Sequence, residues 1–307
     1  MSSHNVDLST TLAGVRLKHV LMNASGILGA TPEHIVRLAS YGLAAVVTKT
    51  FTEKPRGGYG PPIILKLKNC GYINAVGLAN PGIELLPQVV KKGKELNLVT
   101  IVSVGGSSLE EFIKVSTVAL DSGADMLELN LGCPHTKGYG LDIGSDPTNV
   151  YEVVKAVSSL SSVPVIAKLS LSDNYVKSSG KALEGGARAL TLINTIKAMV
   201  IDVYSAKPVL SNVFGGMSGP PIHPVAVKVV YDVYKEYEPD IVGVGGIVDW
   251  VSAAEFILAG AKALQIGSAL STKPKEIIDS VLKGLREWVS ELGYTRIADL
   301  VGLAHKK

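Results

Sequence analysis

The feature that most limits the possible folds is a series of eight short apolar segments spaced along almost the whole chain. Stretches with helical character separate them, such as 108–123 (SLEEFIKVSTVALDSG) and 250–260 (WVSAAEFILAG). Runs that are apolar on both faces and alternate with helices are typical of parallel strands covered by helices. Eight such units in order predict an α/β fold, the TIM (β/α)8 barrel. The expected strands are 19–25, 44–50, 100–106, 126–132, 165–170, 189–195, 241–247 and 263–269.

Two connections are longer than a simple strand-to-helix loop requires. They cover residues 51–99, after the second expected strand, and 196–240, after the sixth. Long ordered insertions in compact domains commonly serve the active site, so we expect both to cover the active face. The opening segment 7–18 (DLSTTLAGVRLK) predicts a small hairpin that closes the barrel floor. No linker interrupts the pattern, and we therefore expect residues 1–307 to form one domain.

Composition excludes several classes of function. The chain has 307 residues, an apolar fraction of 47% and a formal charge of +3, too small a charge to indicate a nucleic-acid or anionic-membrane surface. No apolar run approaches the roughly 20 residues of a membrane span, and the first residues lack the apolar stretch of a secretion signal. Two cysteines cannot hold an iron–sulfur cluster, which normally takes four thiolates. We expect a cytoplasmic protein.

Polar residues fall at the ends of separate expected strands. The carboxyl ends of the strands are where chemistry is built in this fold, with several strands contributing. Buried amides and ammonium groups also need polar partners, so many such residues at one rim indicate a site. These residues are Asn23, Ser25, Lys49, Ser103, Asn130, Lys168, Asn194 and Thr195.

Glycine-rich segments at the ends of the last two strands predict a phosphate site. Gly245, Gly246, Gly267 and Ser268 expose backbone N–H groups near the starts of helices, and a further glycine run covers 214–220 (FGGMSGP). An ammonium group such as that of Lys168 would stabilise the anionic form of a reduced flavin. These features favour FMN, whereas no GxGxxG sequence follows the first strand to indicate a nicotinamide dinucleotide.

A set of motifs in order resembles one family. They are ASGILG, VVTKTFTEKPR, INAVGLANPG, ELNLGCP, AKLS, LINT, GGMSGPPIHPVAVK, GVGGI and IGSA, spread from about residue 20 to 270. The pattern resembles dihydroorotate dehydrogenases, especially the catalytic subunit of the soluble, heterotetrameric class-1 (1B) kind. The resemblance implies FMN-dependent oxidation of (S)-dihydroorotate to orotate in pyrimidine (UMP) biosynthesis.

The resemblance also implies roles for individual residues. Cys133 matches the catalytic base, which takes a proton from the substrate ring while the neighbouring carbon gives hydride to the flavin. The implied substrate contacts are Lys49, Asn74, Gly77, Leu78, Asn130, Asn194 and Thr195. The implied flavin contacts are Ser25, Gly26, Lys49, Thr50, Ser103, Asn130, Lys168, Ile193, Gly219, Gly245, Gly246, Gly267 and Ser268. No metal is implied, and the histidines show no metal-ligand spacing.

One departure from the family pattern keeps a rival open. His135 follows the CP pair where most of the family has asparagine, and dihydropyrimidine dehydrogenases, which act on uracil or thymine, also carry CPH. His135 could tune the thiol or face solvent. The segment INAVGLANPG matches the carboxylate-binding loop of dihydroorotate enzymes, and a uracil pocket has no carboxylate to hold. A tRNA-dihydrouridine synthase would need a basic RNA-binding surface that this chain lacks.

The electron acceptor stays open between two arrangements. One is a homodimer that uses fumarate, and the other is a heterotetramer with a partner subunit that carries FAD and an iron–sulfur cluster. Similarity to the heterotetrameric kind favours the partner subunit. Cys70, the second cysteine, is expected to be a packed small apolar residue.

Overall fold

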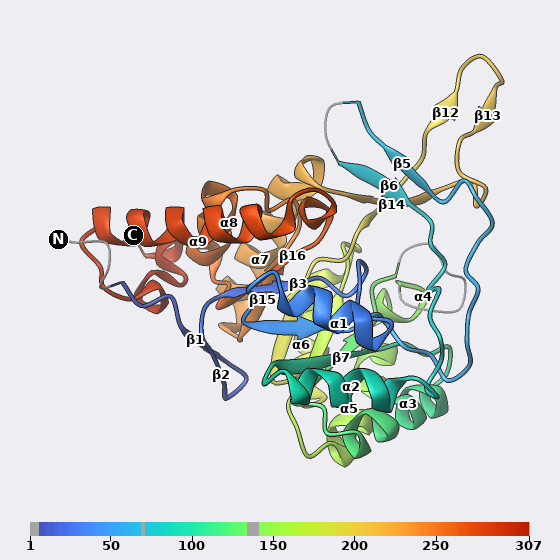
Figure 1. Cartoon of the computed structure of the whole chain (residues 1–307), viewed down its shortest axis with the longest axis horizontal. Coiled ribbons are helices and arrows are strands. Elements are labelled where there is room, and N and C mark those ends of the chain that lie inside the picture. The colour runs from blue at the N-terminus through green and yellow to red at the C-terminus, as the bar shows by residue number, and fades with distance from the viewer. Residues whose placement is uncertain (1–5, 69–70, 134–140, 307) are drawn as a thin grey trace.

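The computed structural model describes residues 6–68, 71–133 and 141–306, and its centre is a closed barrel of eight parallel strands (Figure 1). Each strand pairs with the next in chain order, and the last pairs with the first. The predicted TIM barrel is therefore confirmed. The strands are β3 (Leu21–Asn23), β4 (Ala45–Val47), β7 (Val99–Val104), β8 (Met126–Asn130), β9 (Val165–Leu169), β10 (Ala189–Leu192), β15 (Ile241–Val244) and β16 (Ala263–Ile266).

Helices cover the outside of the barrel, and polar caps mark where several of them begin. Ser108 accepts a hydrogen bond from the backbone of Glu111, and Asp249 forms a capping box with Ser252. In the described ranges, no helix is both long and apolar enough to cross a membrane. The helices are α1 (Pro32–Ala39), α2 (Leu86–Glu95), α3 (Leu109–Asp121), α4 (Leu141–Gly144), α5 (Pro147–Leu160), α6 (Tyr175–Glu184), α7 (His223–Tyr237), α8 (Trp250–Ala259) and α9 (Pro274–Glu291).

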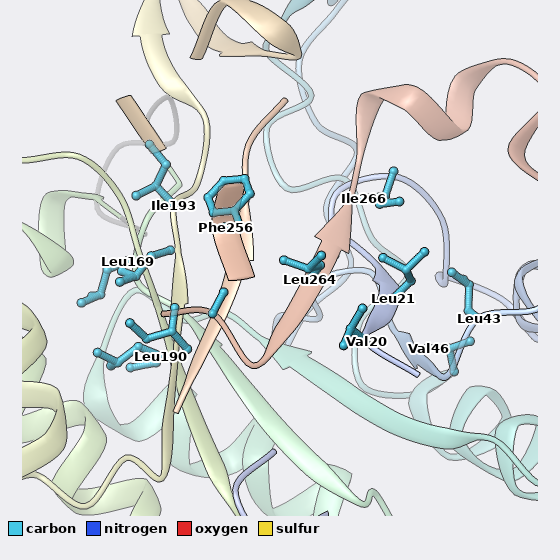
Figure 2. Packing of buried hydrophobic residues seen from close by; sticks show 14 of the residues in the cluster. Val20, Leu21, Leu43, Val46, Leu169, Leu190, Ile193, Phe256, Leu264 and Ile266 are labelled. Atoms are coloured by element: carbon cyan, nitrogen blue, oxygen red, sulfur yellow. The ribbon is translucent and has the colours of Figure 1, made fainter. Parts of the chain in front are cut away.

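Two apolar layers fix the barrel. The larger one packs strand side chains against the helices, and Figure 2 shows part of it, including Leu190, Phe256 and Leu264. The smaller one fills the barrel floor, where Leu12 and Leu17 pack with residues from the starts of the strands. These two leucines belong to the antiparallel hairpin of β1 (Thr10–Leu12) and β2 (Val15–Leu17), which closes the floor as predicted.

The two long connections meet in a second sheet at the opposite end of the barrel from this hairpin (Figure 1). The first supplies β5 (Ile64–Lys66) and β6 (Tyr72–Asn74), and the second supplies β11 (Ile196–Ala198) and β14 (Gly215–Ser218). All neighbours in the order β11-β14-β6-β5 pair antiparallel. A smaller hairpin, β12 (Ile201–Asp202) with β13 (Lys207–Pro208), projects from the second connection.

Most barrel strands end earlier than predicted. The expected strand 44–50 ends at Val47, and the expected strand 189–195 ends at Leu192. The difference has a physical reason: the residues beyond these ends, such as Lys49 and Asn194, line a cavity, and the backbone N–H of Lys49 bonds the carbonyl of Gly29 instead of a neighbouring strand.

Candidate active site

A cavity of about 360 Å³ opens at the carboxyl ends of the barrel strands. Its size lies in the range usual for small-molecule sites. Most of the predicted site residues line it, although they come from distant parts of the chain. They are Ser25, Gly26, Lys49, Thr50, Asn74, Leu78, Asn130, Cys133, Lys168, Ile193, Asn194, Thr195, Gly219, Gly245, Gly246, Gly267 and Ser268.

Two predicted residues do not line the cavity themselves. Ser103 is fully buried beneath the rim, where its hydroxyl lies 2.9 Å from the hydroxyl of Thr50. Gly77 lies between two lining residues, Val76 and Leu78. Asn23, another rim residue, instead joins two strands, since its side chain bonds both the N–H and the C=O of Val47.

A chain of side-chain hydrogen bonds crosses the rim. Asn130 donates to the hydroxyl of Thr50 at 3.0 Å and accepts from the side-chain amide of Asn194 at 3.0 Å. Asn194 in turn accepts from the backbone of Thr195 at 2.8 Å. Because each amide is held by a neighbour, its orientation is fixed before any ligand arrives. The rim therefore offers donors and acceptors in set directions.

A thiol and an ammonium group share the cavity. Cys133 follows β8 and is 5% exposed, and Lys49 donates to the carbonyl of Gly26 at 2.9 Å. Burial lowers the pKa of the Lys49 ammonium group, and the negative charge of the Cys133 thiolate partly opposes that shift. The reciprocal interaction favours the thiolate, the basic and nucleophilic form of cysteine. The predictions for His135 and Cys70 fall outside the described residues.

Lys168 lies at the base of the cavity and is 4% exposed. Its ammonium group donates to the side-chain oxygen of Gln265 at 2.8 Å and to the hydroxyl of Ser25 at 3.4 Å. It also lies 3.4 Å from a carboxylate oxygen of Glu128. These three partners hold the ammonium group of Lys168 in one place.

Glu128 and Gln265 are site residues that the sequence reasoning missed. Glu128 is fully buried and accepts from Gln265 at 2.6 Å and from the hydroxyl of Thr191 at 3.0 Å. The sequence did carry a signal for Glu128, which is a charged residue in an apolar strand. It lies two positions before Asn130, and alternate residues of a strand point to the same face. Glu128 and Gln265 lie beneath the cavity, whereas four missed residues that do line it, Ile64, Tyr72, Val76 and Ser218, come from the insertions.

The glycine-rich strand ends form a narrow part of the cavity wall. Gly245 and Gly246 have positive φ angles of 143° and 72°. A Cβ on Gly245 would lie 2.6 Å from Ala226, and a Cβ on Gly246 would lie 2.8 Å from the carbonyl oxygen of Gly219. Packing against these neighbours therefore requires glycine at both positions, and the part of the wall that they line is bare backbone, which suits close approach to a phosphate group. Together with the buried Lys168 ammonium group, these residues could hold a phosphorylated cofactor.

The fold and the rim cavity define a (β/α)8-barrel protein with an enzyme-type site at the carboxyl ends of its strands. Comparison with known proteins narrows this class. The family model described as "Dihydroorotate dehydrogenase" matches residues 7–289. The chain belongs to the dihydroorotate dehydrogenase family, and it is an oxidoreductase, as the sequence analysis predicted.

Relatives in several organisms match along almost their whole length. The chain is 44% identical to a putative dihydroorotate dehydrogenase A (fumarate) of Aeropyrum pernix, covering 98% of each chain. It is 44% identical to the dihydroorotate dehydrogenase B (NAD(+)) catalytic subunit of Pyrococcus horikoshii, covering 97% of this chain and 98% of that one. The corresponding subunit of Thermoplasma volcanium is 46% identical over 98% and 99%.

A solved structure has the same fold. It is the dihydroorotate dehydrogenase of Eimeria tenella in complex with ferulenol, with a TM-score of 0.84 and 22% identity. The match covers 98% of this chain and 89% of that one. At this identity the likeness supports the barrel architecture alone.

Proposed function

We propose that the protein is an FMN-dependent dihydroorotate dehydrogenase that oxidises (S)-dihydroorotate to orotate for de novo pyrimidine (UMP) synthesis. The observation that carries the proposal is that Cys133 and Lys168 line one cavity together with asparagine side chains and glycine-rich strand ends. FMN, when bound, supplies the acceptor for the hydride that leaves the substrate.

Cys133 acts as the base in this proposal. Its Sγ removes a proton from the ring carbon next to the one that loses hydride, and the electron pair of that C–H bond becomes the second bond between the two carbons. The thiol then carries the proton. The Lys49 ammonium group supports this role because a nearby positive charge favours the thiolate before the reaction.

The polar rim binds the substrate ring and its carboxylate. A pyrimidine imide edge alternates N–H and C=O groups, and amide side chains offer both donors and acceptors. Asn74, Asn130, Asn194 and Thr195 are proposed to contact the ring. Lys49, with the backbone of Gly77 and Leu78, is proposed to hold the carboxylate, for which a cation is the natural partner.

The remaining residues are proposed to hold FMN. Gly219, Gly245, Gly246, Gly267 and Ser268 would contact the phosphate end, and Lys168 would lie at the flavin ring. Ser25, Gly26, Thr50 and Ile193 would line the ring. Ser103 would act through Thr50, with which it exchanges a hydrogen bond.

The partner is part of the proposal. The names of the relatives divide between fumarate and NAD(+) as acceptor. We propose the second arrangement, a cytoplasmic heterotetramer in which a subunit with FAD and an iron–sulfur cluster passes electrons to NAD. The alternative is a homodimer that reduces fumarate. Affinity purification from the native host, with absorbance scanned for cluster bands, separates the two.

The substrate is tested by anaerobic mixing of the oxidised protein with dihydroorotate or with dihydrouracil. We expect dihydroorotate to bleach the flavin absorbance, and dihydrouracil to bleach it at least 100-fold more slowly. Dihydrouracil lacks the carboxylate, and a site whose polar groups are left unpaired rejects such a ligand strongly, by roughly 10⁴-fold in the best cases. Preferential bleaching by dihydrouracil would reject the proposal in favour of a dihydropyrimidine dehydrogenase-like activity.

A further inference from the structure

His223, the first residue of α7, lies behind the glycine-rich wall of the cavity. One ring nitrogen, Nδ1, lies 2.8 Å from the carbonyl oxygen of Gly245, and the other, Nε2, lies 2.7 Å from a carboxylate oxygen of Glu255. The edge of the ring also meets the ring of Phe256, with the centroids 5.1 Å apart. The imidazole, on the helix that follows the sixth barrel strand, is thus held on three sides by residues that follow the seventh.

Both polar partners of the ring accept hydrogen bonds and cannot donate them. A backbone carbonyl has no hydrogen to give, and neither does an ionised carboxylate. The contact with the Gly245 carbonyl therefore requires a hydrogen on Nδ1, and the ring donates from that nitrogen. Nε2 lies beside the Glu255 carboxylate, which holds the ring from its other side.

The contact with Gly245 sets the direction of one peptide group. In a trans peptide the C=O and the following N–H point in opposite directions. Because the Gly245 carbonyl points at His223, the N–H of Gly246 points away from that ring, and both glycines line the cavity. The reversed peptide would turn a carbonyl oxygen toward an anion instead of a donor.

We propose that His223 is a positioning residue for phosphate: its Nδ1–H holds the Gly245–Gly246 peptide with the Gly246 N–H facing the cavity, and Glu255 holds the ring. The inference rests on the proposed function in one respect, because it takes the phosphate to be that of FMN. It goes beyond that function by assigning phosphate affinity to two side chains outside the cavity lining.

The test compares two flavins that differ in the phosphate. Apoprotein is titrated with FMN and with riboflavin, which lacks the phosphate, and binding is followed by quenching of flavin fluorescence. We expect His223→Phe to raise the Kd for FMN roughly five- to tenfold, which corresponds to the loss of one hydrogen bond. The Kd for riboflavin should change less than about twofold. An equal rise for both ligands, or no rise for FMN, would overturn the inference.

Two further variants distinguish positioning from general disturbance. His223→Asn keeps a donor near the position of Nδ1, and it should recover most of the FMN affinity that His223→Phe loses. His305→Phe is a matched control, because His305 also bonds a backbone carbonyl, that of Ala259 at 3.0 Å, away from the cavity lining. Failure of Asn to recover affinity, or an equal phosphate-specific loss in His305→Phe, counts against the inference.

A phosphate-only readout separates this inference from the proposed function. Inorganic phosphate should raise the Tm of wild-type apoprotein and raise it less in His223→Phe. If the wild-type protein binds no FMN yet shows this His223-dependent protection, the proposed function fails and the inference stands. Equal phosphate protection of both proteins, or none in either, contradicts the inference itself.

Discussion

The ammonium nitrogen of Lys168 lies 3.4 Å from Oε1 of Glu128, and the two side chains are only 5% and 0% exposed. An ion pair this deep in a barrel is costly to desolvate, and its two members depend on each other. The pair connects the inside of the barrel to the cavity, because Lys168 lines the cavity and Glu128 does not. The position of the Lys168 ammonium group is therefore set in part by a residue below the site.

Glu128→Gln should destabilise the protein by about 3 kcal/mol, since it leaves a buried ammonium group without its counter-charge. Urea unfolding of the apoprotein measures the loss. Lys168→Met added to Glu128→Gln should restore part of the stability, because it removes the unpaired charge. A single variant as stable as wild type would show that the pair contributes little.

Lys49 should make substrate binding depend on pH, because it is proposed to hold the substrate carboxylate. Burial lowers its pKa below the usual 10.5, so the folded protein loses this positive charge at a lower pH than a free lysine would. The KM for dihydroorotate should therefore rise as the pH passes through the lowered value, because the neutral amine no longer attracts the carboxylate. Lys49→Met should have a KM that is raised at least tenfold and is flat over this range. A flat profile in the wild-type protein contradicts the role.

His19 should make the fold sensitive to acid. Its Nε2–H bonds the carbonyl of Gly42 at 2.9 Å, and Nδ1 accepts from the backbone of Leu21 at 3.1 Å. Burial lowers its pKa below 6.5, so the unfolded chain binds the proton more tightly. The free energy of unfolding should thus fall as the pH drops below about 6.5, until the lowered pKa is reached. His19→Gln should flatten this part of the curve, and an unchanged slope would exclude His19 as the cause.

Much of the fold could be predicted from local patterns. Each of the eight apolar runs overlaps a barrel strand, and the hairpin at the floor was visible as two short segments around Gly14. The sheet formed by the insertions could not be predicted in the same way. It pairs Asn74 with Gly216, residues that are distant in the chain, and no local period encodes such a pairing.

The sequence predicted which residues belong to the site better than it predicted the contacts between them. Rim position alone indicated Lys168 and Asn130, because the ends of parallel strands meet at one edge. Their partners were not predictable, since the sequence does not say that Glu128 reaches Lys168 or that Asn130 bonds Thr50. His223 was assigned no role for the same reason, because its contacts with Gly245 and Glu255 join three separate elements. The single-domain expectation stays a prediction.

The most direct test of the account is the anaerobic half-reaction of Cys133→Ala with dihydroorotate, followed by stopped-flow absorbance of the flavin. We expect the variant to keep its yellow flavin and to reduce it roughly 10²- to 10⁴-fold more slowly than wild type, the usual contribution of a positioned general base. Flavin reduction at the wild-type rate would contradict the assignment of Cys133 as the base.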